Sequence, residues 1–248
     1  MKRTMVLIVL AVLAFAAILI ARLPASWVIP SASAEVGCAE AAGTIWNGNC
    51  IGLTAERQAL GDLSWELHPV RLLAARIDGD IVLTHPAGSI RGSVEIGFGK
   101  LVTARNVRAN LTIDPRLIPQ LPPSLRDLRG TLNADIVLLR LQANSIRTLA
   151  GTLEVHDLQA GAGNAIEQYG SYSLSFPGGG GAPVGQLRDL GGPLAVEGSV
   201  RLIPGPGFDL QGLVAARPTA SPQLVNEIRF LGSPDAQGRR PFALEMAL

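Results

Sequence analysis

Short windows in which apolar and polar residues alternate recur along most of the chain, and they constrain the fold more than any other feature. Between residues 106 and 113, Val107, Ala109, Leu111 and Ile113 point to one side, and polar residues point to the other. Comparable windows lie at 76–83, 91–98, 131–136 and 196–202. This period of two is typical of β-strands with one wet face and one buried face. The chain is therefore predicted to be mainly β, with antiparallel strands.

Turn-forming residues separate these windows, and little helix is available to cover the buried face. The chain holds 28 glycines and 17 prolines, and turns are predicted at 85–88 and 204–207, with a mobile loop at 176–181. Helix is indicated only at 115–121 and at 222–231. Two short helices cannot cover eight or more strands. The sheet is therefore expected to curl into a sandwich, a partial barrel or a trough with an apolar interior.

The N-terminal segment is the second strong signal. An uninterrupted apolar run from Met5 to Ala21 follows Lys2 and Arg3 and ends before Arg22. Its length is at the short end of what spans a hydrocarbon core of roughly 30 Å. The alternative is a cleaved signal peptide, since residues 32–34 have the small-x-small form of a cleavage site. An uncleaved anchor is preferred because the run is longer than a usual signal-peptide core and lies far from that site.

These signals divide the chain into four parts. They are a cytoplasmic tail at 1–4, a transmembrane anchor at 5–22, a linker at 23–42 and a β-rich domain at 43–248. Lys2 and Arg3 favour a cytoplasmic N-terminus, although Arg22 partly offsets this bias. The β-rich domain is thus expected on the far side of the membrane.

Cys38 and Cys50 are the two cysteines of the chain. In an oxidising compartment they would close a loop that stabilises the fold by roughly 3 kcal/mol, mainly by restricting the unfolded chain. In a reducing compartment they would be two free thiols. The disulfide is predicted, conditional on the topology.

The sequence offers little that indicates catalysis, and no cofactor or metal is expected. His68, His85 and His156 fall in separate segments and are interpreted as surface histidines. Gly92 and Gly97 have the spacing of a phosphate-binding loop, but the lysine that such a loop requires is missing. A formal net charge of +1 gives no reason to expect nucleic-acid binding. The sequence favours a protein that is not an enzyme.

Two tryptophan motifs follow the apolar run at short distance. The first, Gly-Thr-Ile-Trp-Asn-Gly at 43–48, comes after Leu-Pro-Ala-Ser-Trp at 23–27. The second runs from Leu60 through Trp65 and Pro69 to Leu73. This succession resembles the type II secretion system protein N family, and the residues that carry the resemblance are Pro24, Trp27, Gly43, Trp46, Gly48, Gly61, Trp65, Pro69 and Leu72. Trp46 and Trp65 can equally be two core aromatics that anchor the first hairpin.

The resemblance implies an accessory subunit of the machine that exports folded proteins. Such a subunit would be a single-pass protein of the bacterial inner membrane with its bulk in the periplasm. Its expected partners are other subunits of the inner-membrane platform, the outer-membrane secretin, or both. The family brings no catalytic residues.

A second hypothesis starts from the aliphatic face of the predicted sheet, which includes Ile77, Ile81, Val107, Leu111, Leu132 and Val196. A membrane-tethered trough with such a face resembles the AsmA-like envelope proteins, which implies a lipid-binding or lipid-transfer protein. The simpler interpretation is an ordinary packed core. An open apolar cavity would favour lipid binding, and a filled core with an exposed edge strand would favour a docking subunit.

Overall fold

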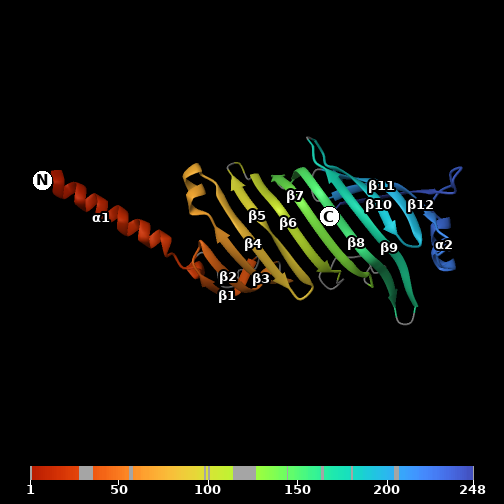
Figure 1. The fold of residues 1–248 in the computed structure, drawn as a ribbon, viewed down its shortest axis with the longest axis horizontal. Helices are drawn as coiled ribbons and strands as arrows, with labels where there is room; N and C mark the ends of the chain where they lie inside the picture. The colour runs from red at the N-terminus through yellow and green to blue at the C-terminus, as the bar shows by residue number, and fades with distance from the viewer. Residues whose placement is uncertain are drawn as a thin grey trace. The chain divides into compact units, whose positions relative to one another are not determined.

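The computed structural model describes residues 2–27, 36–55, 58–97, 99, 101–113, 127–143, 145–162, 165–179, 181–203 and 207–247. The chain forms two compact units, Met1–Pro86 (unit 1) and Ala87–Leu248 (unit 2). The described strands are antiparallel to their neighbours, and few helices accompany them (Figure 1). The prediction of a mainly β fold is therefore confirmed.

Unit 1 begins with helix α1 (Lys2–Ala21) and the short 3₁₀ helix η1 (Ala25–Trp27). Its strands are β1 (Val36–Gly43), β2 (Asn47–Ala55), β3 (Gln58–Leu67) and β4 (Ile77–His85). A second 3₁₀ helix, η2 (Pro69–Ala74), connects β3 to β4. Each strand pairs with the next, so the four form a meander.

Strand β1 begins before the predicted start of the β-rich domain at residue 43. Residues 36–42, which were assigned to a linker, pair with β2, and Val36 lies opposite Ala55. Glycines and alanines dominate this strand, so it lacks the alternation that marks the others. Residues 28–35 of the predicted linker lie outside the described residues.

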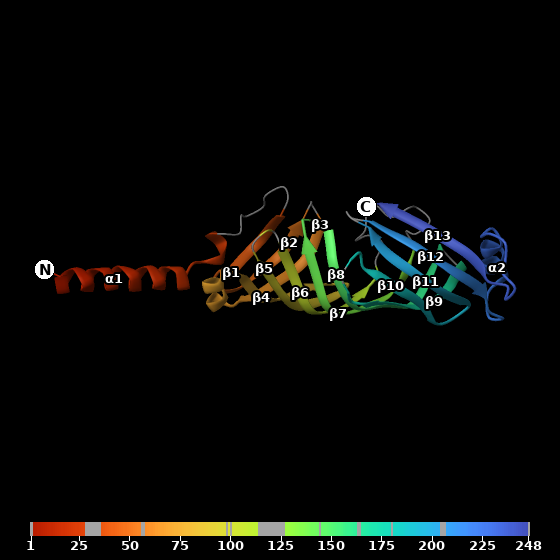
Figure 2. The ribbon, with the colours of Figure 1, turned by 90° about the horizontal axis from the view of Figure 1, so that it is seen from above.

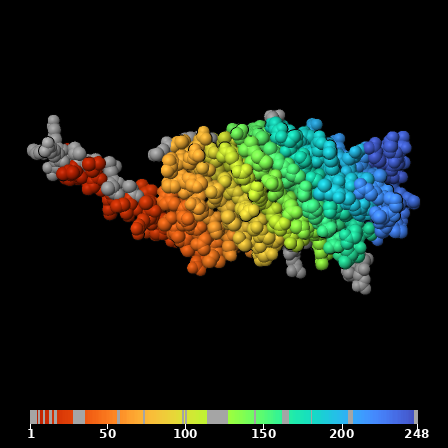
Figure 3. Space-filling view, viewed as in Figure 1, coloured from red at the N-terminus to blue at the C-terminus, as the bar shows by residue number. Residues whose placement is uncertain are grey.

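Unit 2 is a longer meander followed by a helix and a last strand. Its first strands are β5 (Gly88–Gly97), β6 (Leu101–Thr112), β7 (Arg129–Gln142), β8 (Ser145–Ala162) and β9 (Ala165–Pro177). They are followed by β10 (Val184–Gly191), β11 (Leu194–Ile203), β12 (Gly207–Ala216), helix α2 (Pro222–Arg229) and β13 (Arg240–Ala247). The strands follow one another in chain order across the sheet (Figures 1 and 3). Among the described residues β13 pairs only with β12, so the sheet is open at this strand.

The strand register places predicted apolar residues of neighbouring strands opposite one another. Val107 lies opposite Ile136, and Leu111 lies opposite Leu132, which in turn lies opposite Val155. One apolar cluster is centred on Ile136, Leu149 and Phe176, all nearly buried. The sheet of unit 2 is curved (Figure 2).

Several sequence-based expectations differ from the structure in detail. Phe176 was assigned to a mobile loop, but β9 extends to Pro177 and only 3% of Phe176 is exposed. Its ring lies over Gly185 on β10, where an added Cβ would be 2.8 Å from the ring, so the core continues to the end of the strand. Helix α2 ends at Arg229, two residues before the predicted end. The predicted helix at 115–121 and part of the turn at 204–207 lie outside the described residues.

Candidate functional sites: the α1 joint and the apolar cavity

The first motif forms the loop between β1 and β2. Gly43 and Gly48 are opposite each other and close the loop. Gly43 has φ +87°, and an added Cβ would lie 2.5 Å from the Asn47 oxygen, so this position requires glycine. The Thr44 hydroxyl oxygen accepts the backbone N–H of Trp46 at 3.3 Å and that of Asn47 at 3.1 Å. Gly43, Thr44 and Gly48 thus each help to form a tight loop.

This loop holds the C-terminal end of α1. The Trp46 indole Nε1 donates a hydrogen bond to the Ile20 carbonyl oxygen over 2.8 Å. The Ile45 amide donates to the Leu23 carbonyl at 3.0 Å, and Pro24 forms an isolated β-bridge with Thr44. The last carbonyls of a helix have no partner within the helix. The loop supplies a hydrogen-bond partner for one of these carbonyls, that of Ile20. We call residues 20–24 and 44–47 the α1 joint.

The second motif supports the joint from β3. The Trp65 indole donates to the Ile45 carbonyl at 3.1 Å, and the Leu67 amide donates to the Trp46 carbonyl at 2.6 Å. The Trp65 ring lies against Gly48, where an added Cβ would be 2.6 Å from the ring. Both tryptophans are half-buried in the first hairpins, so the interpretation as anchoring aromatics describes their packing. The structure adds that both indole N–H groups bind backbone carbonyls around α1.

The remaining motif residues have different surroundings. Gly61 has φ +102°, and an added Cβ would lie 2.1 Å from the Thr84 oxygen, so it permits a close approach of β4. Pro69 begins η2, where its missing N–H costs nothing. Leu72 and Trp27 are 43% and 78% exposed. The sequence motifs therefore combine a structural joint with an exposed apolar surface.

The predicted disulfide between Cys38 and Cys50 is present and joins β1 to β2. The two Cα atoms are 5.7 Å apart, a usual separation for a disulfide. The cysteines are 5% and 1% exposed. The bond therefore lies in the small core of unit 1.

The predicted anchor, Met5 to Ala21, coincides with helix α1. Large apolar side chains of this helix are exposed, among them Met5 at 71%, Leu7 at 66% and Phe15 at 64%. Within the residues that the structure describes, no helix combines the length and the apolarity needed to cross a membrane.

Unit 2 contains an apolar cavity of about 670 Å³ between α2 and the sheet. Aliphatic and aromatic side chains from strands β8 to β13 form most of its wall, among them Tyr169 and Tyr172 of β9, and Leu224 and Ile228 line it from α2. Glu227 is the charged residue among those that line it. Apolar pockets of 300–1,000 Å³ are of the size that binds small molecules.

Helix α2 is held at both ends. Ser221 caps its N-terminus by accepting the Leu224 amide at 3.1 Å, and its hydroxyl donates to Glu167 at 2.7 Å. At the other end Arg240 donates to the carbonyls of Leu231 at 3.2 Å and Gly232 at 2.6 Å. Sequence reasoning did not single out these residues. Ser221 before Pro222 is nevertheless a recognisable helix start.

An ion pair lies beside the cavity. Arg217 donates to the Asp189 carboxylate at 2.6 Å. Burial would raise the pKa of Asp189. Its carboxylate, however, accepts hydrogen bonds from Arg217 and from the amides of Val196 and Gly191. These bonds and the charge of Arg217 hold the pKa of Asp189 below its ordinary value. Burial, together with the charge of Asp189, raises the pKa of Tyr172 to about 12. Tyr172 therefore lines the cavity as a neutral phenol.

The described residues bring together no group of His, Cys, Asp and Glu side chains that can hold a metal ion. His68 lies 3.6 Å from Asp78, and His156 lies 3.2 Å from Glu154, so two of the three histidines pair with carboxylates. The two features that stand out in the described residues are the structural joint at α1 and the apolar cavity in unit 2.

Comparisons with known proteins agree with the motif resemblance. Residues 34–243 match the family described as "Type II secretion system (T2SS), protein N". A relative from Aeromonas hydrophila, named Type II secretion system protein N, is 24% identical over 247 residues, which cover 97% of each chain. No solved structure matches the chain at a significant level. The family match includes both tryptophan motifs and most of the described strands, and the chain belongs to the type II secretion system protein N family.

Proposed function

We propose that this member of the type II secretion system protein N family, an accessory component of type II secretion, is a non-catalytic subunit that bridges the inner membrane and the periplasmic or outer-membrane components during export of folded proteins. Its partners would be other subunits of the inner-membrane platform, the outer-membrane secretin, or both. The observation that carries this proposal is the family match along nearly all of the chain outside α1.

In the proposed arrangement residues 5–22, which include most of α1, are the membrane anchor, residues 1–4 are cytoplasmic, and the β-rich part is periplasmic. The apolar run from Met5 to Ala21 and the exposed apolar side chains of α1 support this arrangement. A disulfide that joins two strands is expected in an oxidising compartment, which the periplasm provides.

Photo-crosslinking in living cells tests the bridging role. A photoreactive amino acid would replace exposed residues on each unit, for example Val82 on β4 (43% exposed) and Val137 on β7 (60% exposed). Crosslinks to a platform subunit from one unit and to the secretin or a periplasmic component from the other would support bridging. Crosslinks to the same subunit from both units, or to none, would contradict it.

The cavity of unit 2 favours a second function, binding of a lipid acyl chain as in an AsmA-like groove. Its wall is almost wholly apolar, and it is open rather than filled by packed side chains. Burying an acyl chain there would gain about 0.8 kcal/mol per methylene group. Mass spectrometry of organic extracts from purified protein tests this function. Stoichiometric phospholipid or fatty acid would support it, and a lipid-free protein that takes up no added fatty acid would refute it.

A further inference from the structure

The segment that connects β3 to β4 is unusually apolar for an exposed turn. Every described side chain from His68 to Ile77 is exposed, including Val70 at 75%, Leu72 at 43% and Ile77 at 45%. The segment comprises η2 and the turn that follows it. Contiguous exposed apolar residues of this kind mark interaction sites. We call residues 69–77 the η2 ridge.

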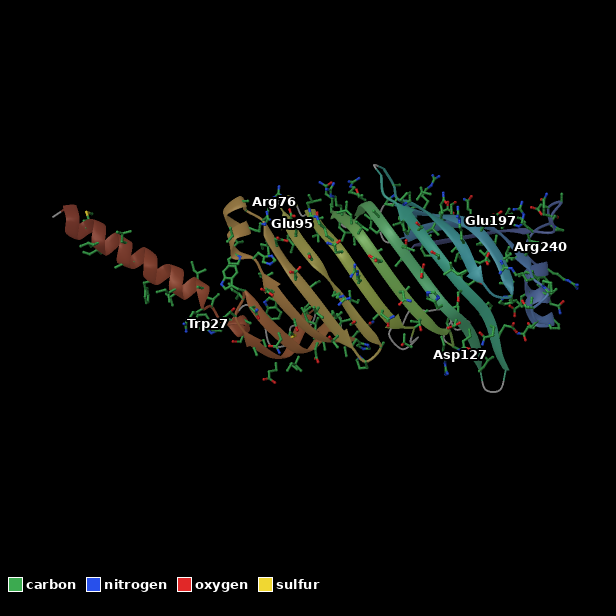
Figure 4. The ribbon with its side chains drawn as sticks, in the orientation of Figure 1. Trp27, Arg76, Glu95, Asp127, Glu197 and Arg240 are labelled. Atoms are coloured by element: carbon green, nitrogen blue, oxygen red, sulfur yellow. A yellow bond between two sulfur atoms is a disulfide. The ribbon has the colours of Figure 1, made fainter. Side chains whose placement is uncertain are left out.

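A chain of hydrogen bonds places the start of this ridge near the end of α1. The Trp46 indole binds the Ile20 carbonyl, and the Trp46 carbonyl binds the Leu67 amide. Pro69, the first residue of the ridge, follows Leu67 by two positions. Two views show η2, the short gold helix, at the end of unit 1 from which α1 departs (Figures 1 and 2). Trp27, 78% exposed, lies at the same end (Figure 4).

The charges of the ridge have one sign. Arg71 and Arg76 are its charged residues, and it contains no Asp or Glu. The Arg71 side chain is 67% exposed, although its Nε lies 3.6 Å from Asp78. Arg22, directly after α1, adds a further cation at this end. Basic residues beside exposed apolar side chains are the pattern of a segment that binds an anionic lipid surface.

We propose that the η2 ridge sits on the membrane, in the leaflet from which α1 emerges. Val70 and Leu72 enter the boundary between headgroups and acyl chains, and Arg71 and Arg76 contact lipid phosphates. The membrane thereby holds unit 1 at two points, α1 and the ridge, and the α1 joint fixes the distance between them. This inference rests on the proposed role of α1 as a membrane anchor.

Spin labelling of the full-length protein in nanodiscs of phosphatidylcholine and phosphatidylglycerol tests the proposal. The two native cysteines form the disulfide, so an introduced cysteine is the single reactive thiol. Three variants are labelled separately: Val70→Cys on the ridge, Val82→Cys on β4, and Phe15→Cys on α1. Val82 is a matched control, because it is an exposed valine of the same unit, five residues and roughly 16 Å beyond Ile77 along β4. Collision with oxygen, which concentrates in lipid, is compared with collision with a water-soluble nickel chelate.

The proposal predicts lipid-like accessibility at positions 15 and 70 and water-like accessibility at position 82. Lipid-like accessibility at position 15 with water-like accessibility at position 70 would overturn the ridge inference and leave the anchor standing. That outcome is also expected if a protein partner covers the ridge in cells. Water-like accessibility at position 15 would overturn both the anchor and the inference that rests on it.

Discussion

Replacement of Gly48 by alanine tests the packing of the tryptophan motifs most sharply. The added Cβ would lie 2.6 Å from Cζ2 of Trp65, 2.7 Å from the Ala42 oxygen and 2.8 Å from the Thr44 oxygen. Two of these contacts are backbone atoms of the closed loop, and the third belongs to a ring that its own hydrogen bond holds in place. No neighbour can therefore move away without breaking a contact of the joint.

The expected loss follows from this geometry. Overpacking of a closed site costs about 1 to 3 kcal/mol. A Gly→Ala change without steric overlap would stabilise the folded protein by about 0.4 to 1 kcal/mol, because it restricts the unfolded chain. The net loss of unfolding free energy should therefore fall in the lower half of the range given for overpacking. A loss of about 1 to 2 kcal/mol would lower the melting temperature of a small unit by roughly 4 to 16 °C.

Tryptophan fluorescence during thermal unfolding reports this loss, because Trp27, Trp46 and Trp65 all lie in unit 1. Gly97→Ala is the matched control, since among the described residues an added Cβ there would meet only the Leu101 oxygen, at 3.9 Å. The control should change stability by less than about 0.5 kcal/mol, as followed by circular dichroism. Equal stability of Gly48→Ala and the wild type would refute the reasoning about the joint.

Three further changes address the joint, the cavity and the ion pair. Trp46→Phe removes the donor to α1, worth about 0.5 to 1 kcal/mol, so hydrogen exchange of the Ile45 amide should become about 2 to 5 times faster. Leu224→Ala, at a side chain 2% exposed, should lower the unfolding free energy of unit 2 by about 2 to 5 kcal/mol in urea titrations. Asp189→Asn should destabilise the protein at pH 7, and this loss should shrink progressively as the pH is lowered below the ordinary pKa of an aspartate. The folded pKa of Asp189 lies below the ordinary value of about 3.9, so its contribution is complete above that pH and disappears as the pH falls through the folded pKa.

Two of these predictions have a control variant, and the Asp189→Asn prediction is controlled by its dependence on pH. Trp27→Phe, at a residue 78% exposed, should leave amide exchange in the joint unchanged. Phe230→Ala, at a residue 90% exposed directly after α2, should change stability by less than about 0.5 kcal/mol. Faster exchange in Trp27→Phe, equal effects of the two α2 changes, or a loss for Asp189→Asn that stays the same as the pH falls would each count against the corresponding argument.

Alternation made most of the fold predictable from sequence. The windows at 131–136 and 196–202 lie in β7 and β11, and the window at 106–113 lies in β6 up to Thr112, because strands with one exposed face must alternate. Strand β1 was not recognised, since its small residues carry no alternation and its place depends on pairing and on the disulfide. Ile77 was expected in the interior but is 45% exposed, because it lies at the first position of β4, directly after the turn that follows η2.

The functional surfaces were less predictable, for physical reasons. The motif spacing identified Trp46 and Trp65, but their partners are backbone carbonyls, which leave no signal in a sequence. Ile20 lies 26 residues before Trp46, and only the folded loop brings the two together. The volume of the cavity depends on the curvature of the sheet and on the position of α2, neither of which alternation determines.

Secretion by a strain that lacks this gene tests the central claim most directly. A secreted hydrolase would be assayed in the medium and in the periplasm, with the wild-type gene and Gly48→Ala supplied in parallel. A role in type II secretion predicts that the hydrolase accumulates in the periplasm of the deletion strain and returns to the medium with the wild-type gene. Export at the normal rate in the deletion strain would contradict a required role in secretion.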